Sequence, residues 1–89
     1  MQRSEMTELF YKAIVSLNSV EDCRHFFEDA CTPKEIQAIA QRFAVAKMLS
    51  DGKVYNEIVE ATGASTATIS RVSRAINKGF KAALERLED

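Results

Sequence analysis

The sequence predicts an all-α domain of six helices that carries a helix-turn-helix. Apolar residues recur at helical spacing along the chain, and only three glycines and one proline interrupt them. One of those glycines separates two short amphipathic segments in the run YNEIVEATGASTATISRVSRAI, residues 55–76. Hydrophobic residues make up 46% of the 89 positions, which indicates a folded chain, and a chain this short fills a single core. We therefore expect one domain over residues 1–89.

The first third of the chain predicts two amphipathic helices, one over about residues 5–17 and one from Val20 to near Cys31. Ser19, with Asp22 three residues later, resembles a capping box, which is typical of a helix start. Each helix has one apolar stripe, and we expect the stripe of the second helix to be its buried face. The stripes consist of Leu9, Phe10, Ala13, Ile14 and Leu17 on the first helix and Val20, Cys23, Phe26, Phe27 and Ala30 on the second.

The two cysteines and the single histidine predict neither a disulfide nor a metal site. Cys23 and Cys31 lie eight positions apart on one predicted helix, a separation of about 12 Å at about 1.5 Å per residue, which a disulfide cannot bridge. We expect both to be buried thiols. His25 has no nearby cluster of Cys, His or Asp at metal-binding spacing, so we expect no metal and no cofactor.

The third helix has the clearest start signal in the chain. Thr32-Pro33-Lys34-Glu35 combines a capping threonine, a proline at the first helical position and a glutamate that reaches back to the cap. The helix should continue to about Ser50, where Asp51-Gly52 stops it. It is apolar almost all round, and a single core contact cannot cover so wide a face. We therefore expect residues 1–50 to form the interface of a homodimer, with a monomer that covers this helix internally as the alternative.

Residues 54–77 predict two helices joined by a tight turn, from about Val54 to Ala61 and from about Thr66 to Asn77. Gly63 can adopt the left-handed conformation that ends a helix. Ser65 stands where the N-cap of the next helix belongs. This spacing is typical of a helix-turn-helix.

The second helix of this unit has two distinct faces. Ile69, Val72 and Ile76 form its buried stripe and should pack on Ile58 of the first helix. The outward face lacks acidic residues and consists of Thr66, Ala67, Ser70, Ser73, Arg74 and Asn77. Small residues let a helix approach base edges, so the unit predicts DNA binding, with an ordinary helical hairpin as the alternative. Gly79 should then break the chain before a last amphipathic helix over residues 80–88.

The net charge of −1 is unevenly distributed. Residues 1–33 carry three basic and six acidic side chains, residues 34–62 carry four of each, and residues 63–89 carry five basic and three acidic ones. The basic excess therefore follows the helix-turn-helix, and a local patch suffices to neutralise a few phosphates. No apolar run approaches the ~20 residues that span a bilayer, and no signal-peptide core is present, so we expect a cytoplasmic protein.

The run GASTATISRV at residues 63–72, together with TPKEIQAIAQRFAVAKMLSDG at residues 32–52, resembles the tryptophan repressor superfamily. The resemblance is closest to its bacterial TrpR-like YerC/YecD group and extends from Cys31 to about Lys78. It implies a TrpR-like intertwined dimer that presents two helix-turn-helix units to double-stranded DNA. A transcriptional regulator of this kind, a repressor rather than an enzyme, would select a near-palindromic operator, since its recognition helices lie about 34 Å apart.

The residue types and the resemblance together predict the DNA contacts. Methyl and hydroxyl groups at the start of the second helix can meet a thymine methyl or a base acceptor. Basic and hydroxyl groups around them can hold phosphates, which sets the register without reading sequence. The expected contacts are Thr66, Ala67 and Ser70 to bases, Ser65, Arg74 and Lys78 to phosphates, and Asn56, which aligns with a DNA-contacting position on the family's first motif helix.

The resemblance also implies an effector pocket for an unidentified small molecule. Arg42 and Arg71 align with the two arginines that flank the bound amino acid in the tryptophan repressor, and Thr68 aligns with another pocket residue. Val72, however, stands where the repressor has a glycine beside the indole, and Ala75 stands where a serine meets the ligand's amino group. Valine occupies ring space, and a lost buried hydrogen bond costs roughly 1 to 3 kcal/mol, so tryptophan is not the expected corepressor.

Other roles for the arginines stay open from the sequence. Arg42 and Arg71 can contact phosphates or pair with Glu57 or Glu60. Small helical dimeric enzymes such as the chorismate mutases also bind anionic substrates with arginines. Arg42 and Arg71, together with Gln41, could form a similar substrate site. No positioned acid/base pair or nucleophile accompanies it, so we expect no enzyme. A helical adaptor that binds a protein through its last helix is the third class.

Overall fold

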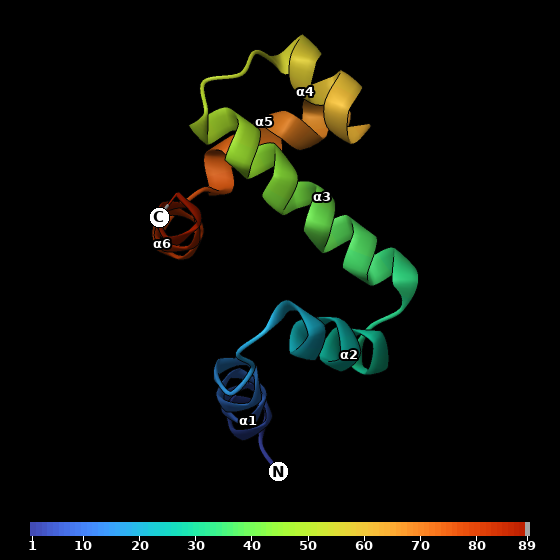
Figure 1. The fold of residues 1–89 in the computed structure, drawn as a ribbon, viewed down its shortest axis with the longest axis vertical. Coiled ribbons are helices and arrows are strands. Elements are labelled where there is room, and N and C mark those ends of the chain that lie inside the picture. Colours follow the sequence, from blue (N-terminus) through green and yellow to red (C-terminus); the bar gives the residue numbers. More distant parts are fainter. Residues whose placement is uncertain (89) are drawn as a thin grey trace. The chain divides into compact units, whose positions relative to one another are not determined.

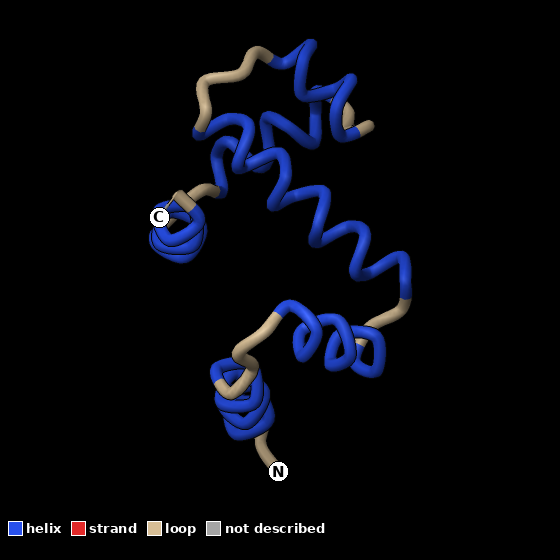
Figure 2. Tube along the Cα trace, in the orientation of Figure 1, coloured by secondary structure: helices blue, strands red, loops and turns tan. Residues whose placement is uncertain are grey.

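A computed structural model describes residues 1–88 and confirms the all-α prediction, with six helices and no strand among these residues (Figures 1 and 2). Backbone contacts divide the chain into two units, residues 1–36 and the residues from Gln37 onward. Within the described residues, no helix has the length and apolar character needed to cross a membrane. Each unit is built from local helix signals that the sequence carries.

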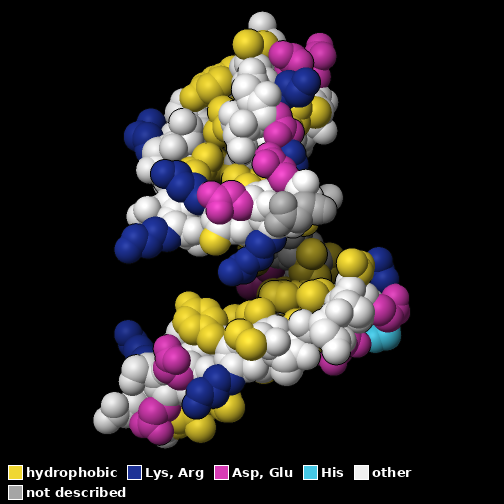
Figure 3. Space-filling model, turned by 60° about the vertical axis from the view of Figure 1, so that its left-hand side comes forward, with side chains coloured by type: hydrophobic (Ala, Val, Ile, Leu, Met, Phe, Trp, Pro, Cys, Tyr) yellow, Lys and Arg dark blue, Asp and Glu magenta, His cyan; other side chains and the backbone are white. Residues whose placement is uncertain are grey.

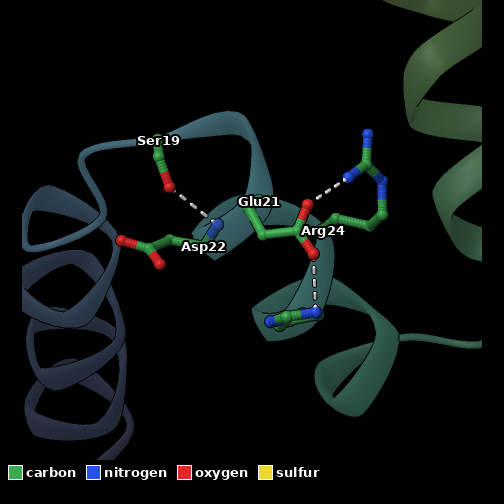
Figure 4. Close-up of polar contacts among 5 residues, drawn as sticks. Ser19, Glu21, Asp22 and Arg24 are labelled. Atoms are coloured by element: carbon green, nitrogen blue, oxygen red, sulfur yellow. Dashed lines mark hydrogen bonds and ion pairs between the residues drawn. The ribbon is translucent and has the colours of Figure 1, made fainter.

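The first unit contains α1 (Arg3–Val15) and α2 (Val20–Ala30). The helix start predicted at Ser19 is confirmed, because the Ser19 hydroxyl accepts a hydrogen bond from the Asp22 backbone N–H at 3.0 Å (Figure 4). On the exposed surface of α2, Glu21 accepts from Arg24 at 2.8 Å and lies 2.9 Å from the Nε2 atom of His25. Exposed pairs at this helical spacing contribute only a few tenths of a kcal/mol.

None of the side chains of α1 and α2 is fully buried, so the prediction of a buried face on the second helix is wrong for the single chain. Leu9 is 59% exposed and Val20 74% exposed, and Cys23 is exposed while Cys31 is half-buried, which corrects the expectation of buried thiols. The contact between the helices is a tilted pair of Phe10 and Phe26, with ring centroids 5.9 Å apart. Two short helices cannot enclose each other's apolar faces. Hydrophobic side chains consequently lie on the surface of this unit (Figure 3).

The central helix α3 (Pro33–Ser50) begins with the capping box that the sequence predicts. The Glu35 backbone N–H donates to the Thr32 hydroxyl at 3.2 Å, and the Thr32 N–H donates to the Glu35 carboxylate at 2.8 Å. These hydrogen bonds favour the charged carboxylate and lower the pKa of Glu35. At the other end, Gly52 has a left-handed φ of 81°, which confirms the predicted stop.

The core of the second unit lies where the C-terminal half of α3 meets α4 (Tyr55–Thr62), α5 (Thr66–Ala75) and α6 (Lys78–Leu87). Its buried members are Val45, Ala46, Ile58, Ala64, Ile69, Val72 and Leu84. Phe43 and Phe80 extend it with an edge-to-face ring pair at 5.5 Å. The predicted packing of Ile58, Ile69 and Val72 is confirmed. Part of the apolar surface of α3 stays uncovered, since Ile39 is 51% exposed.

The junction between α5 and α6 differs from the prediction. Helix α5 ends at Ala75 rather than Asn77, and the break falls at Ile76 and Asn77, both in extended conformations. Gly79, expected to be the break, lies in the first turn of α6 without a positive φ. The extended backbone of Ile76 and Asn77 ends α5 there, although Asn77 makes no side-chain capping hydrogen bond to α6. A glycine in a first helical turn is tolerated at modest cost.

Candidate nucleic-acid interface

The turn between α4 and α5 is held by hydrogen bonds on both sides of Gly63. This glycine has φ 73° and ψ 4°, the left-handed conformation that the sequence predicts, and its N–H donates to the Val59 carbonyl at 2.9 Å. Next to it, the Thr62 hydroxyl donates to the Ile58 carbonyl at 2.7 Å and accepts from the Ala64 N–H at 3.1 Å. The angle between α4 and α5 is therefore set by the backbone as well as by packing.

A side chain of α3 fixes the same turn from the core. Gln41 donates from Nε2 to the Thr62 carbonyl at 3.1 Å, and this contact is partly buried. The carbonyl is one of those that a helix end leaves without an intrahelical partner. Gln41 therefore positions the turn, a role that its place on an apolar helix did not indicate.

The start of α5 is capped by its own residues. The Ser65 hydroxyl accepts from the Thr68 backbone N–H at 3.1 Å and donates to the Thr68 hydroxyl at 3.1 Å, which confirms Ser65 as the N-cap. Thr66 and Ala67, the next two residues, are exposed. The first turn of α5 thus presents two small side chains and the positive end of the helix to solvent.

The remaining expected DNA contacts are spread over the same unit. Asn56 is exposed in the first turn of α4, Arg74 is exposed in the last turn of α5, and Lys78 is the first residue of α6 rather than a continuation of α5. Ser70 is half-buried, and its hydroxyl lies 3.5 Å from the hydroxyl of Tyr55 on α4. Sequence reasoning gave Tyr55 no role, because nothing in the local pattern shows that the first residue of α4 meets the middle of α5.

The charge around α5 is basic. Helix α5 carries Arg71 and Arg74 and no acidic residue, and Lys78 and Lys81 follow on α6. All four are exposed, and within residues 1–88 none of them forms a salt bridge. Lys and Arg side chains are visible on the surface of this unit in Figure 3. Unpaired exposed cations are the groups that contribute most directly to phosphate binding.

A cleft of about 650 Å³ lies beside α5 and brings together the three residues that the family resemblance assigned to an effector pocket. Its lining consists of Arg42, Thr68, Arg71, Val72, Ala75, Asn77, Gly79 and Phe80. Val72 is part of the wall and only 4% exposed, and it leaves the cleft open. Neither arginine pairs with Glu57 or Glu60 among the described residues, so both guanidinium groups are free to meet an anion.

The lining of the cleft has cationic and hydroxyl groups but, among residues 1–88, no aspartate, glutamate, histidine or cysteine. Such a site can hold a negatively charged molecule, and it has no side chain that exchanges protons near neutral pH. Asn77, Gly79 and Phe80 were missed as lining residues. They line the cleft because α6 starts directly after the bend at Ile76. The sequence predicted that bend at Gly79.

Comparison with known proteins gives a consistent assignment. The family model of the Trp repressor protein matches residues 5–88. The uncharacterized protein YerC of Bacillus subtilis (strain 168) is 47% identical over 92 residues, which cover 100% of this chain and 88% of YerC.

Two solved structures are also similar. A TrpR like protein from Eubacterium eligens ATCC 27750 has a TM-score of 0.91 and 46% identity over 97% of this chain and 92% of its own. A candidate Trp repressor from Staphylococcus aureus has a TM-score of 0.87 and 43% identity over 98% of this chain and 89% of its own. The chain therefore belongs to the Trp repressor family, within its TrpR-like YerC group.

Proposed function

We propose that this protein is a sequence-specific DNA-binding transcriptional regulator, most simply a repressor, that reads a near-palindromic operator with α5. The observation that carries the proposal is the start of α5. Thr66 and Ala67 are exposed on a capped helix end, no acidic residue lies on α5, and the helix is held against α4 by the Gly63 turn. Those are the requirements of a recognition helix that enters a major groove.

The base-reading residues in this proposal are Thr66, Ala67 and Ser70. Ser65, Arg74 and Lys78 hold phosphates, and Asn56 on α4 is a further DNA contact. All of these residues except the half-buried Ser70 are exposed, which supports the assignment, and so does the lack of salt bridges at Arg74 and Lys78 among the described residues. Phosphate contacts supply most of the affinity and make it salt-dependent, whereas contacts to base edges supply the specificity.

We further propose that the regulator acts as a homodimer. The uncovered apolar surfaces of α1 and α2 and the exposed Ile39 of α3 support this. Monomeric proteins seldom leave apolar surfaces of this extent in water, and a second copy of the chain covers them symmetrically. Two recognition helices related by a two-fold axis would then match a palindrome.

The cleft beside α5 is proposed as the site of a small anionic effector other than tryptophan. Arg42 and Arg71 supply the charge, and Thr68 supplies a hydroxyl. Val72 forms part of the wall beside these groups, and Ala75 offers no hydrogen bond to an amino group. Isothermal titration with L-tryptophan should therefore show no saturable binding, and added L-tryptophan should leave operator affinity unchanged.

One experiment tests the DNA-binding proposal directly. A library of randomised DNA duplexes is bound to the protein, and the enriched sequences are identified. The affinity for the most enriched duplex is then measured over a range of salt concentrations. Light scattering determines the oligomeric state of the protein. We expect a two-fold symmetric consensus and an affinity that falls steeply with salt. The absence of an enriched sequence, or of a salt slope, would show that the protein is not a sequence-specific DNA binder.

A further inference from the structure

We infer that Tyr55 is a positioning residue for base recognition, because its hydroxyl sets the direction in which Ser70 donates its proton to DNA. The inference rests on the proposed function and refines its specificity. It predicts that Ser70 selects a base that presents a hydrogen-bond acceptor in the major groove, namely guanine, the N7 edge of adenine, or the O4 atom of thymine.

The hydroxyl groups of Tyr55 on α4 and Ser70 on α5 lie next to each other. Tyr55 is the first residue of α4 and is 37% exposed. Its hydroxyl oxygen lies 3.5 Å from Oγ of Ser70 in the middle of α5, and either group can be the donor. At this separation the hydrogen bond is weak. A shortening of at least about 0.5 Å would bring the separation into the normal range for two hydroxyls, and such hydrogen bonds tighten when a ligand binds.

The hydroxyl of Ser70 has no competing partner on its own helix. Thr7 and Thr62 both donate back to the carbonyl four residues earlier, at 2.9 Å and 2.7 Å, which is one arrangement open to a helical hydroxyl. Within the described residues Ser70 makes no such bond, and its single side-chain hydrogen bond is with Tyr55. Its proton is therefore available to a group outside the protein.

The chemistry of the two hydroxyls decides the direction of the bond. A phenol hydroxyl is more acidic than an alcohol hydroxyl and is therefore the better donor of the pair. When Tyr55 donates to Oγ of Ser70, the serine proton points away from Tyr55 and needs an acceptor. A base that presents only an amino group, such as the N4 position of cytosine, leaves that proton without a partner.

The test compares base preference in four proteins: wild type, Tyr55→Phe, Ser70→Ala and the double variant. Tyr55→Phe removes the hydroxyl and keeps the ring. Tyr11→Phe on α1, where the tyrosine is also exposed, is the matched control for the same chemical change in the first unit. Each protein is bound to the same randomised duplex library, and thermal unfolding by circular dichroism verifies that each is folded.

For the wild type we expect a preference for acceptor bases at one symmetric pair of operator positions. Tyr55→Phe should reduce that preference roughly two- to tenfold, the range of a single hydrogen bond, and leave other positions and the salt slope unchanged. Ser70→Ala should abolish it, and the double variant should match Ser70→Ala, because Tyr55 acts through Ser70. Tyr11→Phe should behave as wild type.

Two results for Tyr55→Phe would overturn the inference. An unchanged preference would show that Tyr55 does not orient Ser70. An equal loss of affinity for all sequences would show that Tyr55 contacts the DNA backbone itself. A wild-type protein with no sequence preference at all would instead refute the proposed function, so the two failures are distinguishable.

Discussion

Replacing the three glycines by alanine, one at a time, should change the free energy of unfolding in opposite directions: Gly52→Ala and Gly63→Ala should lower it, and Gly79→Ala should raise it. Gly52 and Gly63 have φ values of 81° and 73°, whereas Gly79 lies in α6 without a positive φ. A Cβ atom at any of the three positions meets nothing within 4 Å. Steric clash within the chain is thereby excluded, so the effect expected for each alanine comes from the backbone conformation.

The magnitudes follow from that difference. A left-handed backbone costs a residue with a Cβ atom roughly 1–2 kcal/mol, and the reduced entropy of the unfolded chain offsets about 0.4–1 kcal/mol of this. Gly63→Ala and Gly52→Ala should therefore each lower the free energy of unfolding by about 1 kcal/mol. Gly79→Ala should raise it by about 0.5–1 kcal/mol, because alanine is the better helix former.

The assay is thermal and urea unfolding followed by circular dichroism, at one protein concentration because a dimer's stability depends on it. For a domain of this size, 1 kcal/mol corresponds to a shift in melting temperature of roughly 4–8 °C. Gly52→Ala is the control for Gly63→Ala, since it has the same backbone cost but lies outside the turn between α4 and α5. A destabilising Gly79→Ala would refute the reasoning, because it would mean that the chain breaks at Gly79.

Three further predictions concern the helix starts and the basic surface. Ser65→Ala removes the cap of α5 and should cost about 1 kcal/mol of unfolding free energy, whereas Ser65→Asp should cost little; equal losses would rule out the cap. Arg74→Gln should reduce the slope of log affinity against log salt concentration by about 1, and the same change at Arg24 on α2 should leave the slope unchanged. The pKa of Glu35 is lowered by its hydrogen bonds to Thr32, so its contribution to stability is present above the unfolded-state pKa and is lost as pH falls through the folded-state pKa. Glu35→Gln should thus flatten the acid limb of a stability-versus-pH curve, and an unchanged limb would contradict this.

The helix-turn-helix was predictable because its determinants are local. Gly63 ends α4, Ser65 caps α5, and the spacing of Ile58 and Ile69 brings the two helices together. Each of these signals depends on residues at most a few turns apart. The start of α3 at Thr32 and Glu35 was predictable for the same reason.

Burial in the first unit was not predictable from the single chain. The apolar stripes of α1 and α2 show which faces of these helices are apolar, but a stripe does not show what covers it. In one chain Leu9 and Val20 are exposed, and a homodimer, as we propose, would supply the missing surface. The assignment of residues 1–50 to dimerisation and of residues 1–89 to one domain stays a prediction.

The lining of the cleft was predictable only in part, because it depends on where the chain turns after α5. Family resemblance pointed to Arg42, Thr68 and Arg71, which do share the cleft. Phe80 enters it only because α6 starts at Lys78. A shift of two residues in a helix boundary, too small for periodicity to resolve, thus decides which side chains face the cleft.

Val72 relates the cleft to the reading surface of α5. It is 4% exposed, belongs to the core with Ile69, and also forms part of the cleft wall. Helix α5 is consequently held to the core by its own side chains, and its first turn is closed by Ser65. A ligand that binds in the cleft would contact Arg71 on a helix whose position is already fixed by the core and by the Ser65 cap. On the proposed function, the small molecule therefore adjusts the affinity of a recognition helix that binds DNA without it, and does not assemble that helix.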